Sequence, residues 1–274
     1  MLKNILVILL YICSLSASAE IINVSSNTTE ITLHETNENS IHLSAQLGDM
    51  LVETKDVNSQ TFIQLSIPSF HLSNEIGYPQ LPEMHQLIEM PQGATPRIVV
   101  NSIEIEEIFL ADLGYENPIY PVQPSLSKSQ NPDDVEFVMN TNSYSTNEFR
   151  NQRYVSIIDE GTMRYVRIGN LLIHAVDYNP VLQKIEVVKD IDFTIYFENA
   201  NHMLTNELRT NYYSPYFEPI FSQLINYESQ NFRDDDMISD PAVYVIIANS
   251  AFNGYLDEFI EWKTQKGYIV NVVY

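Results

Sequence analysis

Most of the chain between about residues 40 and 200 has a hydrophobic period of two. Apolar and polar residues alternate in short runs, most clearly over residues 63–67, 103–106 and 191–197. Such alternation directs one apolar face inward and one polar face to water, as antiparallel strands with a single buried face require. Turn signals separate the runs, and no amphipathic helix longer than about two turns is evident before residue 205. The pattern predicts a mainly β fold, an antiparallel β-sandwich or jelly-roll-like domain.

Two segments interrupt this pattern. Residues 123–151 are rich in Ser, Asn, Pro and Asp, with one short apolar patch at 135–139. This composition predicts a long surface loop of the kind that is functional or disordered. Residues 230–241 contain Arg233 followed by three aspartates, and we expect an exposed linker between domains there. Adjacent carboxylates on a linker are usually solvated, so we predict no metal site.

The pattern changes after Pro241. Residues 243–248 (VYVIIA) form a continuous apolar run, which is typical of a strand buried on both faces of a parallel sheet. A helix is expected from about Ala251 to Lys266, with an apolar stripe whose last position is Lys263, and residues 268–274 then read as a second strand. A single βαβ unit cannot cover both faces of its sheet. We therefore interpret residues 242–274 as the start of a truncated α/β domain.

The N-terminus has the order of a secretory signal peptide. Lys3 precedes an apolar run from Ile5 to Leu15, and Ala17-Ser18-Ala19 follows, which predicts cleavage after Ala19. The run of about 11 apolar residues is well short of the roughly 20 that a membrane-spanning helix needs. An uncleaved anchor is therefore the less favoured alternative.

Composition excludes several kinds of site. The single cysteine, Cys13, lies within the predicted signal peptide, so the exported chain has no disulfide, thiolate zinc site or cysteine nucleophile among these residues. Lys and Arg total 14 against 36 Asp and Glu, for a formal net charge of −22. Such a surface repels phosphate backbones and anionic membranes, which argues against nucleic acid as a partner. The acidity suits a soluble exported protein or one that masks a basic partner surface.

Three stretches together resemble the gingipain-type cysteine peptidase precursors. Residues 77–82 (GYPQLP), followed by 91–93 (PQG), are similar to motifs of that family's pro-region, and residues 163–197 resemble its closing strands. Residues 243–248 with 259–267, which contain a W-K-x-x-K-G-like helix end, resemble the opening strand and helix of the caspase-like catalytic domain. The resemblance spans roughly residues 60–274.

The resemblance implies a secreted zymogen. Residues 20–233 would be a β-rich pro-domain that aids folding, inhibits the peptidase domain in cis and is removed by proteolysis, with a linker at 234–241. The expected location is extracellular or on the cell surface, reached through the periplasm if the source is a Gram-negative bacterium. The family's catalytic histidine and cysteine lie beyond the first βαβ unit, so no catalytic residue is assigned and this chain alone should be inactive. No cofactor is expected, and calcium is a candidate only for the missing catalytic domain.

Three arginines are candidates for functional roles. In the family a pro-domain loop can present a basic side chain to the specificity pocket, and Arg150 and Arg153 stand at the end of the long loop. The alternative is that both are solvated loop charges. Arg233 is the candidate maturation site, because it is the last basic residue before the linker ends and exposed linkers attract proteolysis.

A binding module is the competing interpretation. An exported β-sandwich could recognise carbohydrate or a surface protein, and a cluster of aromatic residues is available in the chain: Tyr212, Tyr213, Tyr216 and Phe217. Aromatic residues more often belong to a core, because they bury so much area.

Overall fold

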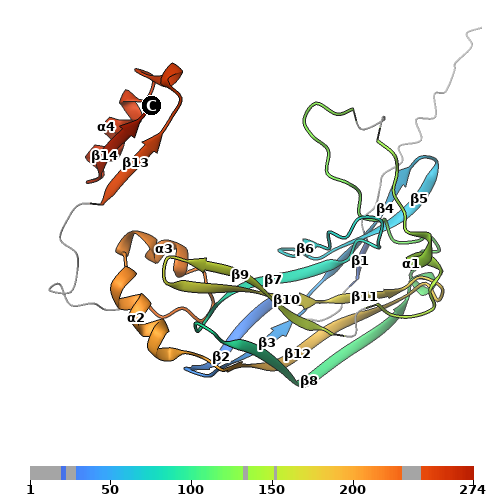
Figure 1. Cartoon of the computed structure of the whole chain (residues 1–274). Helices are drawn as coiled ribbons and strands as arrows, with labels where there is room; N and C mark the ends of the chain where they lie inside the picture. The colour runs from blue at the N-terminus through green and yellow to red at the C-terminus, as the bar shows by residue number, and fades with distance from the viewer. Residues whose placement is uncertain (1–19, 23–28, 132–134, 151–152, 230–241) are drawn as a thin grey trace, which may run out of the picture. The chain divides into compact units, whose positions relative to one another are not determined.

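The computed structural model describes residues 20–22, 29–131, 135–150, 153–229 and 242–274 (Figure 1). The chain divides into two compact units, Met1–Glu228 and Ser229–Tyr274. We call them the β unit and the C-terminal unit and describe each by itself. The described helices include none that is both long and apolar enough to cross a membrane.

The described strands of the β unit form three antiparallel sheets. The largest has the order β11-β12-β3-β2, with β8 also paired to β12: β2 (Glu30–Asn37), β3 (Ser40–Gln46), β8 (Thr95–Phe109), β11 (Val176–Asn179) and β12 (Lys184–Glu198). The second has the order β6-β7-β10-β9: β6 (His71–Leu72), β7 (Pro82–Met90), β9 (Val155–Met163) and β10 (Val166–His174). The third has the order β1-β4-β5: β1 (Glu20–Ile22), β4 (Met50–Val57) and β5 (Gln60–Ser66). The mainly β, antiparallel prediction is confirmed.

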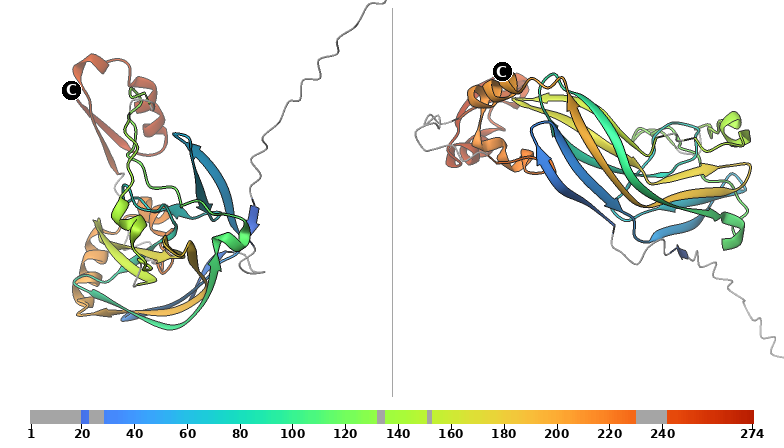
Figure 2. Two further views of the ribbon diagram at one scale, coloured as in Figure 1. Left: turned by 90° about the vertical axis from the view of Figure 1, so that its right-hand side faces the viewer. Right: turned by 90° about the horizontal axis from the view of Figure 1, so that it is seen from below.

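Strand β12 organises the β unit. It pairs with β8 along one edge, and along the other edge with β11 and then β3. Its apolar residues Ile191, Phe193 and Ile195 have no exposed surface, while Asp192 and Thr194 between them are partly exposed. These side chains pack against residues of β3, β7 and β10 in one core, so the two larger sheets form facing layers (Figures 1 and 2). The apolar residues that alternate along β12 therefore form the face of the sheet that is buried between the two layers.

A second core lies where the third sheet meets the start of β12. Its buried residues come from β4, β5, β11 and β12 and include Val52, Leu65, Val176 and Ile185. The irregular segment after β8, with the 3₁₀ turn η1 (Leu110–Leu113), contributes Leu110 and Ile119 to the same core. This core fixes the base of the segment that follows Ile119.

The helices of the β unit are short. They are α1 (Thr141–Ser145), α2 (His202–Tyr212), the 3₁₀ turn η3 (Pro215–Phe217) and α3 (Glu218–Phe221). Asn201 caps α2 by accepting a hydrogen bond from the Leu204 amide at 3.0 Å. Helix α2 was not predicted, because its polar sequence lacks a strong apolar stripe. Residues from the end of α2 to Tyr227 pack with Tyr165 and Val166 in a third, smaller core.

The C-terminal unit has the predicted order of strand, helix and strand. β13 (Val243–Ile247) pairs in parallel with β14 (Ile269–Val273) in a sheet of its own, and α4 (Asp257–Gln265) connects them after the 3₁₀ turn η5 (Ser250–Phe252). The predicted helix start at Ala251 is wrong. Gly254 adopts a left-handed φ of +85°, which interrupts the helical conformation, and α4 begins only at Asp257.

The sheet of the C-terminal unit has one apolar face uncovered. Val243, Val245 and Ile247 are 55–84% exposed, while the intervening Tyr244 and Ile246 are half-buried. The Tyr244 ring contacts Phe259 of α4, with ring centroids 6.0 Å apart. The prediction of a strand buried on both faces therefore does not hold within these residues, because α4 covers only one face.

Candidate functional site

A polar loop rises away from the sheets of the β unit (Figure 1). We call residues 124–137 the projecting loop, of which 132–134 lie outside the described residues. Residues 125–131 are all exposed. A turn is formed near the middle, where the Gln130 amide donates to the Ser127 carbonyl at 3.1 Å and the Ser127 amide donates to Gln130 Oε1 at 2.8 Å. Lys128 stands within this turn.

Gln123 joins the two arms of the projecting loop. Its side-chain Nε2 donates to the Val138 carbonyl at 2.7 Å, and its Oε1 accepts from the Val138 amide at 2.9 Å. Nε2 also lies 3.1 Å from the Pro121 carbonyl and 3.3 Å from that of Val122. One side chain thus takes the place of a strand partner for Val138. We call this pairing of Gln123 with Val138 the neck.

The segment 76–80 crosses beneath the neck, and we call it the strap. The Gly77 amide donates to the Val122 carbonyl at 2.8 Å, and the Gly77 carbonyl accepts from the Asn140 amide at 2.9 Å. Gly77 therefore binds both arms at once. Its φ of +85° and a gap of only 3.2 Å between an ideal Cβ and the Asn140 nitrogen favour glycine and would strain any other residue here. This glycine begins the GYPQLP motif.

An aromatic cluster anchors the returning arm. The Phe137 ring lies 5.4 Å from Phe62 of β5 and 6.1 Å from Tyr120, centroid to centroid, and Phe62 is fully buried. The Lys55 ammonium lies 3.8 Å from the centroid of Tyr120. The short apolar patch in an otherwise polar loop is thereby explained, since Phe137 fastens the arm to the body of the domain.

After the neck the chain turns into α1. The Asn140 side chain caps this helix by accepting hydrogen bonds from the amides of Asn142 and Ser143, at 3.1 and 3.2 Å. Tyr144 Oη donates to the Ile119 carbonyl at 2.6 Å, and burial raises its pKa above the ordinary value. Burial also raises the pKa of Tyr178 to about 12. Both phenols therefore stay neutral at physiological pH.

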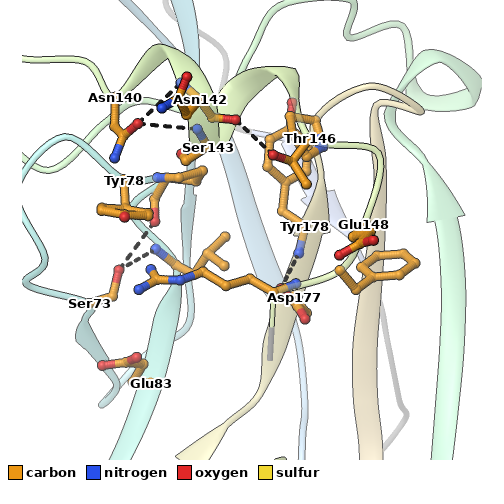
Figure 3. A pocket seen from close by; sticks show the side chains of 15 residues that line it. Ser73, Tyr78, Glu83, Asn140, Asn142, Ser143, Thr146, Glu148, Asp177 and Tyr178 are labelled. Atoms are coloured by element: carbon orange, nitrogen blue, oxygen red, sulfur yellow. Dashed lines mark hydrogen bonds between the residues drawn. The ribbon is translucent and has the colours of Figure 1, made fainter. Parts of the chain in front are cut away.

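A cavity of about 410 Å³ opens between the strap, the segment 140–150 and β11 (Figure 3). Figure 3 shows Tyr78, Asn140, Glu148 and Asp177 among the side chains that line it. Its described lining combines carboxylates and amides with one guanidinium and includes neither histidine nor cysteine. In the described part of the chain, no group of three or more His, Cys, Asp or Glu is placed to hold a metal ion.

Arg150 lies at this cavity and is engaged. Its guanidinium pairs with Glu75 and lies 4.0 Å from the centroid of the Tyr78 ring, and its amide donates to Asp177 Oδ1 at 3.3 Å. Arg150 therefore ties the end of the segment 140–150 to the strap. Arg153 is exposed, just before β9. The other two predicted sites, Ala19 and Arg233, lie outside the described residues.

Sequence reasoning passed over Lys128. It is exposed in the projecting loop and has no ion-pair partner among the described residues, in contrast to Arg150. The signal available in the sequence was simple, because Lys128 is the one basic residue between Gln123 and Phe149. Only the structure shows that the protruding part of the segment ends at the neck, well before Arg150.

The fold and the fastened loop define a class: an antiparallel β domain that presents a loop outward, as inhibitory and binding modules do. Residues 24–233 match the Propeptide_C25 family. This match covers most of the chain, and the chain belongs to that family.

The relatives extend the match beyond the propeptide. Lys-gingipain of Porphyromonas gingivalis is 31% identical over 260 residues, which is 95% of this chain and 15% of that protein. Gingipain R2 of the same species is 24% identical over 198 residues, 71% of this chain and 25% of that protein. The chain thus spans only about a sixth of the length of the Lys-gingipains. An alignment over 95% of the chain has to include part of the C-terminal unit.

Two solved structures share the fold. One, described as giving structural insight into zymogenic latency of gingipain K from Porphyromonas gingivalis, has a TM-score of 0.62 and 31% identity, and the match covers 67% of this chain and all of that one. The other, a complex of Porphyromonas gingivalis RgpB pro- and mature domains, has a TM-score of 0.58 and 18% identity over 72% of this chain and 98% of that one. The β unit therefore has the gingipain pro-domain fold. The jelly-roll connectivity stays a prediction.

Proposed function

We propose that residues 20–233 are the folding aid and latency domain of a gingipain-like cysteine endopeptidase made as one precursor. Residues 242–274 would form the first βαβ unit of the peptidase domain, joined through a linker at 234–241. The precursor would be secreted or displayed at the cell surface, through the periplasm of a Gram-negative bacterium. The predicted signal peptide and the relatives from Porphyromonas gingivalis support this location.

One observation carries the proposal. The propeptide match covers residues 24–233, and the 31% identity to Lys-gingipain continues past it into the C-terminal unit. A binding module that merely shared the β fold would have no reason to continue into a parallel strand-helix-strand segment. Of the four clustered aromatic residues, Tyr213 and Phe217 pack in the core with Tyr165 and Phe221, which leaves only Tyr212 and Tyr216 exposed and weakens the case for a sugar groove.

The projecting loop supplies a mechanism for latency. A loop held outside a folded domain can enter an active cleft while its backbone is kept out of the geometry that attack requires. Fastening both arms to the domain limits the conformations the loop explores, which reduces the entropy cost of binding. A basic side chain on such a loop could fill a specificity pocket that accepts a cation.

The three basic residues of this region are not equivalent. Arg150 would have to give up Glu75 and Tyr78 before it could reach a partner, at a cost in free energy. Lys128 has no such contact among the described residues and stands in the exposed turn. We therefore place Lys128 in the peptidase cleft, with Arg150 as the anchor of the segment that follows and Arg153 as the alternative contact.

Inhibition of a mature peptidase tests the proposal. The chain from Glu20 to Tyr274 is titrated against mature Lys-gingipain of Porphyromonas gingivalis, and hydrolysis of a peptide substrate of that enzyme is followed. We expect inhibition by the unmodified chain, and Lys128→Ala should raise the inhibition constant at least tenfold because it removes the side chain that occupies the pocket.

Arg150→Ala and Arg153→Ala complete the panel, and Lys189→Ala serves as control because Lys189 pairs with Glu104 and Glu106 away from the loop. Absence of inhibition by the unmodified chain would overturn the proposed function. If Lys128→Ala, Arg150→Ala and Arg153→Ala all inhibit as strongly as the unmodified chain, the projecting loop and the segment after it have no part in the mechanism.

A further inference from the structure

The sequence around Gly77 and the side chain of Gln123 lie far apart in the chain, yet they meet under the projecting loop. From this juxtaposition we propose that Gln123, supported by Gly77, is the positioning residue that holds the loop in its inhibitory conformation. The inference rests on the proposed function and goes beyond it, because it assigns loop presentation to residues that do not themselves enter the cleft.

At the neck, the hydrogen bonds between the two arms are made by one side chain, that of Gln123. Val138 makes both of its backbone hydrogen bonds to the Gln123 amide, at 2.7 Å through the carbonyl and 2.9 Å through the N–H. At neutral pH a primary amide can donate and accept simultaneously in this planar, strand-like manner, which an ionised carboxylate cannot do. Alanine would leave both Val138 groups unpaired, and the arms would separate at this point.

The strap sets the position of the neck on the domain. Gly77 binds Val122 on the outgoing arm and Asn140 on the returning arm, and Val122 also donates to the Tyr78 carbonyl at 2.8 Å. Gln80 extends this pairing by donating to the Tyr120 carbonyl at 2.9 Å. The GYPQLP segment thus acts as a strand under the loop, and the left-handed φ of Gly77 lets it bind in both directions.

These ties leave the loop rigid at its base and exposed at its tip. Next to the neck, the loop residue Phe137 packs on Phe62 and Tyr120. Above it, residues 125–131 are exposed and the described contacts are local to the turn, such as Ser127 with Gln130. Orientation of the tip relative to the domain is therefore set where Gln123 closes the neck.

Gln123→Ala is the principal variant, in the chain from Glu20 to Tyr274. The Val138 amide should lose at least tenfold in hydrogen-exchange protection, and trypsin should cut after Lys128 several-fold faster. The inhibition constant for mature Lys-gingipain should rise about tenfold, which corresponds to about 1.4 kcal/mol. The midpoint of thermal unfolding should stay close to that of the unmodified chain, because the neck lies outside both large cores.

Gln123→Glu provides a signature that a merely structural role would not show. The carboxylate can still accept from the Val138 N–H, but it places a charge against three carbonyl oxygens that Nε2 now contacts. Protection of the Val138 amide should therefore be low at pH 7 and return as the pH falls below about 4, where a neutral carboxylic acid can donate. Gln123→Ala should show no such recovery.

Gln86→Ala is the matched control, since the Gln86 side chain also donates to a backbone carbonyl, that of Leu87 at 3.0 Å, but on β7. It should leave exchange and inhibition unchanged. Equal inhibition by Gln123→Ala and the unmodified chain would overturn the inference while leaving the proposed function intact. Failure of the unmodified chain to inhibit would overturn the proposed function, whatever the exchange results. Loss of cooperative unfolding in both Gln123 variants would also overturn the inference, since it would make Gln123 part of the fold.

Discussion

One largely buried ion pair joins a helix of the β unit to a sheet. Glu89 of β7 and Arg209 of α2 form an ion pair with 12% and 18% of their side chains exposed. Burial raises the pKa of Glu89, and the Arg209 charge and hydrogen bond offset part of that rise. Asn226 closes the same site by bonding to the amide and carbonyl of Glu89, at 2.7 and 2.9 Å. The pair therefore fastens α2 to the second sheet.

Arg209→Ala should destabilise the β unit by about 3–5 kcal/mol, because it leaves the Glu89 carboxylate buried without its partner. Glu89→Gln in the same chain should recover part of this loss, since no buried charge then remains. A carboxyl whose pKa is raised on folding contributes stability below its unfolded pKa and loses it as the pH rises through the folded pKa. The deficit of Arg209→Ala should consequently shrink as the solution is acidified.

Urea unfolding of the single and double variants at pH 5 and pH 8 measures both effects. The exposed pair of Arg97 with Glu198 provides the control, because Arg97→Ala removes an ion pair in water and should cost less than about 1 kcal/mol. A deficit in Arg209→Ala that is the same at both pH values would contradict this account of Glu89.

Among the elements, α4 has an unusual feature in that its apolar stripe ends in a lysine. The Lys263 ammonium lies 4.6 Å from the centroid of Trp262 and 4.8 Å from that of Tyr244, with Phe259 and Tyr268 at 5.4 and 5.7 Å. Its hydrocarbon stem covers apolar surface while the charge meets the faces of aromatic rings. Lys263 can therefore occupy the last position of the apolar stripe of α4, where the helical period predicts an apolar residue.

Lys263→Met should lower the stability of the C-terminal unit by roughly 0.5–1 kcal/mol, because it keeps the stem and removes the charge that the rings attract. Trp262 is the only tryptophan of the chain, so its fluorescence follows unfolding of this unit alone. Lys189→Met in the β unit should leave the Trp262 signal unchanged. An equal or higher midpoint in Lys263→Met would show that the rings require only an apolar stem.

For the whole molecule, the central question is how a latency domain would be released. Arg233 is the last basic residue before the three aspartates at 234–236, which precede β13 in the sequence. Connecting segments with few residues to bury are the places where proteolysis concentrates. Cleavage there would separate the β unit, including its projecting loop, from everything that follows in the chain.

Incubation of the chain with trypsin, which cleaves after arginine as well as lysine, should produce a new N-terminus at Asp234, which N-terminal sequencing identifies. Arg233→Gln should abolish this product or slow its appearance at least tenfold, since the scissile basic residue is gone. Arg97→Gln, an exposed arginine on β8, is the control and should release the same product as the unmodified chain. A first cut far from Asp234 would reject Arg233 as the maturation site.

The sequence by itself determined the strands and the change of architecture near residue 241. Alternation at Ile191, Phe193 and Ile195 reports burial directly, because successive residues of a strand point to opposite faces. The continuous run from Val243 likewise predicted the parallel strand that the structure has. The family resemblance followed from short motifs, although the role of GYPQLP could not be read from them.

Only the tertiary structure decided which residues hold the loop and which are available on it. The sequence does not show that Arg150 contacts Glu75 and Tyr78. It also does not show that the projecting loop ends at the neck and therefore contains Lys128 but not Arg150. Helix α2 depends on packing around Tyr165 rather than on a strong pattern of its own. The physical reason is common to all three: periodicity records how each segment divides between core and water, whereas contacts between distant segments arise only when the sheets bring them together.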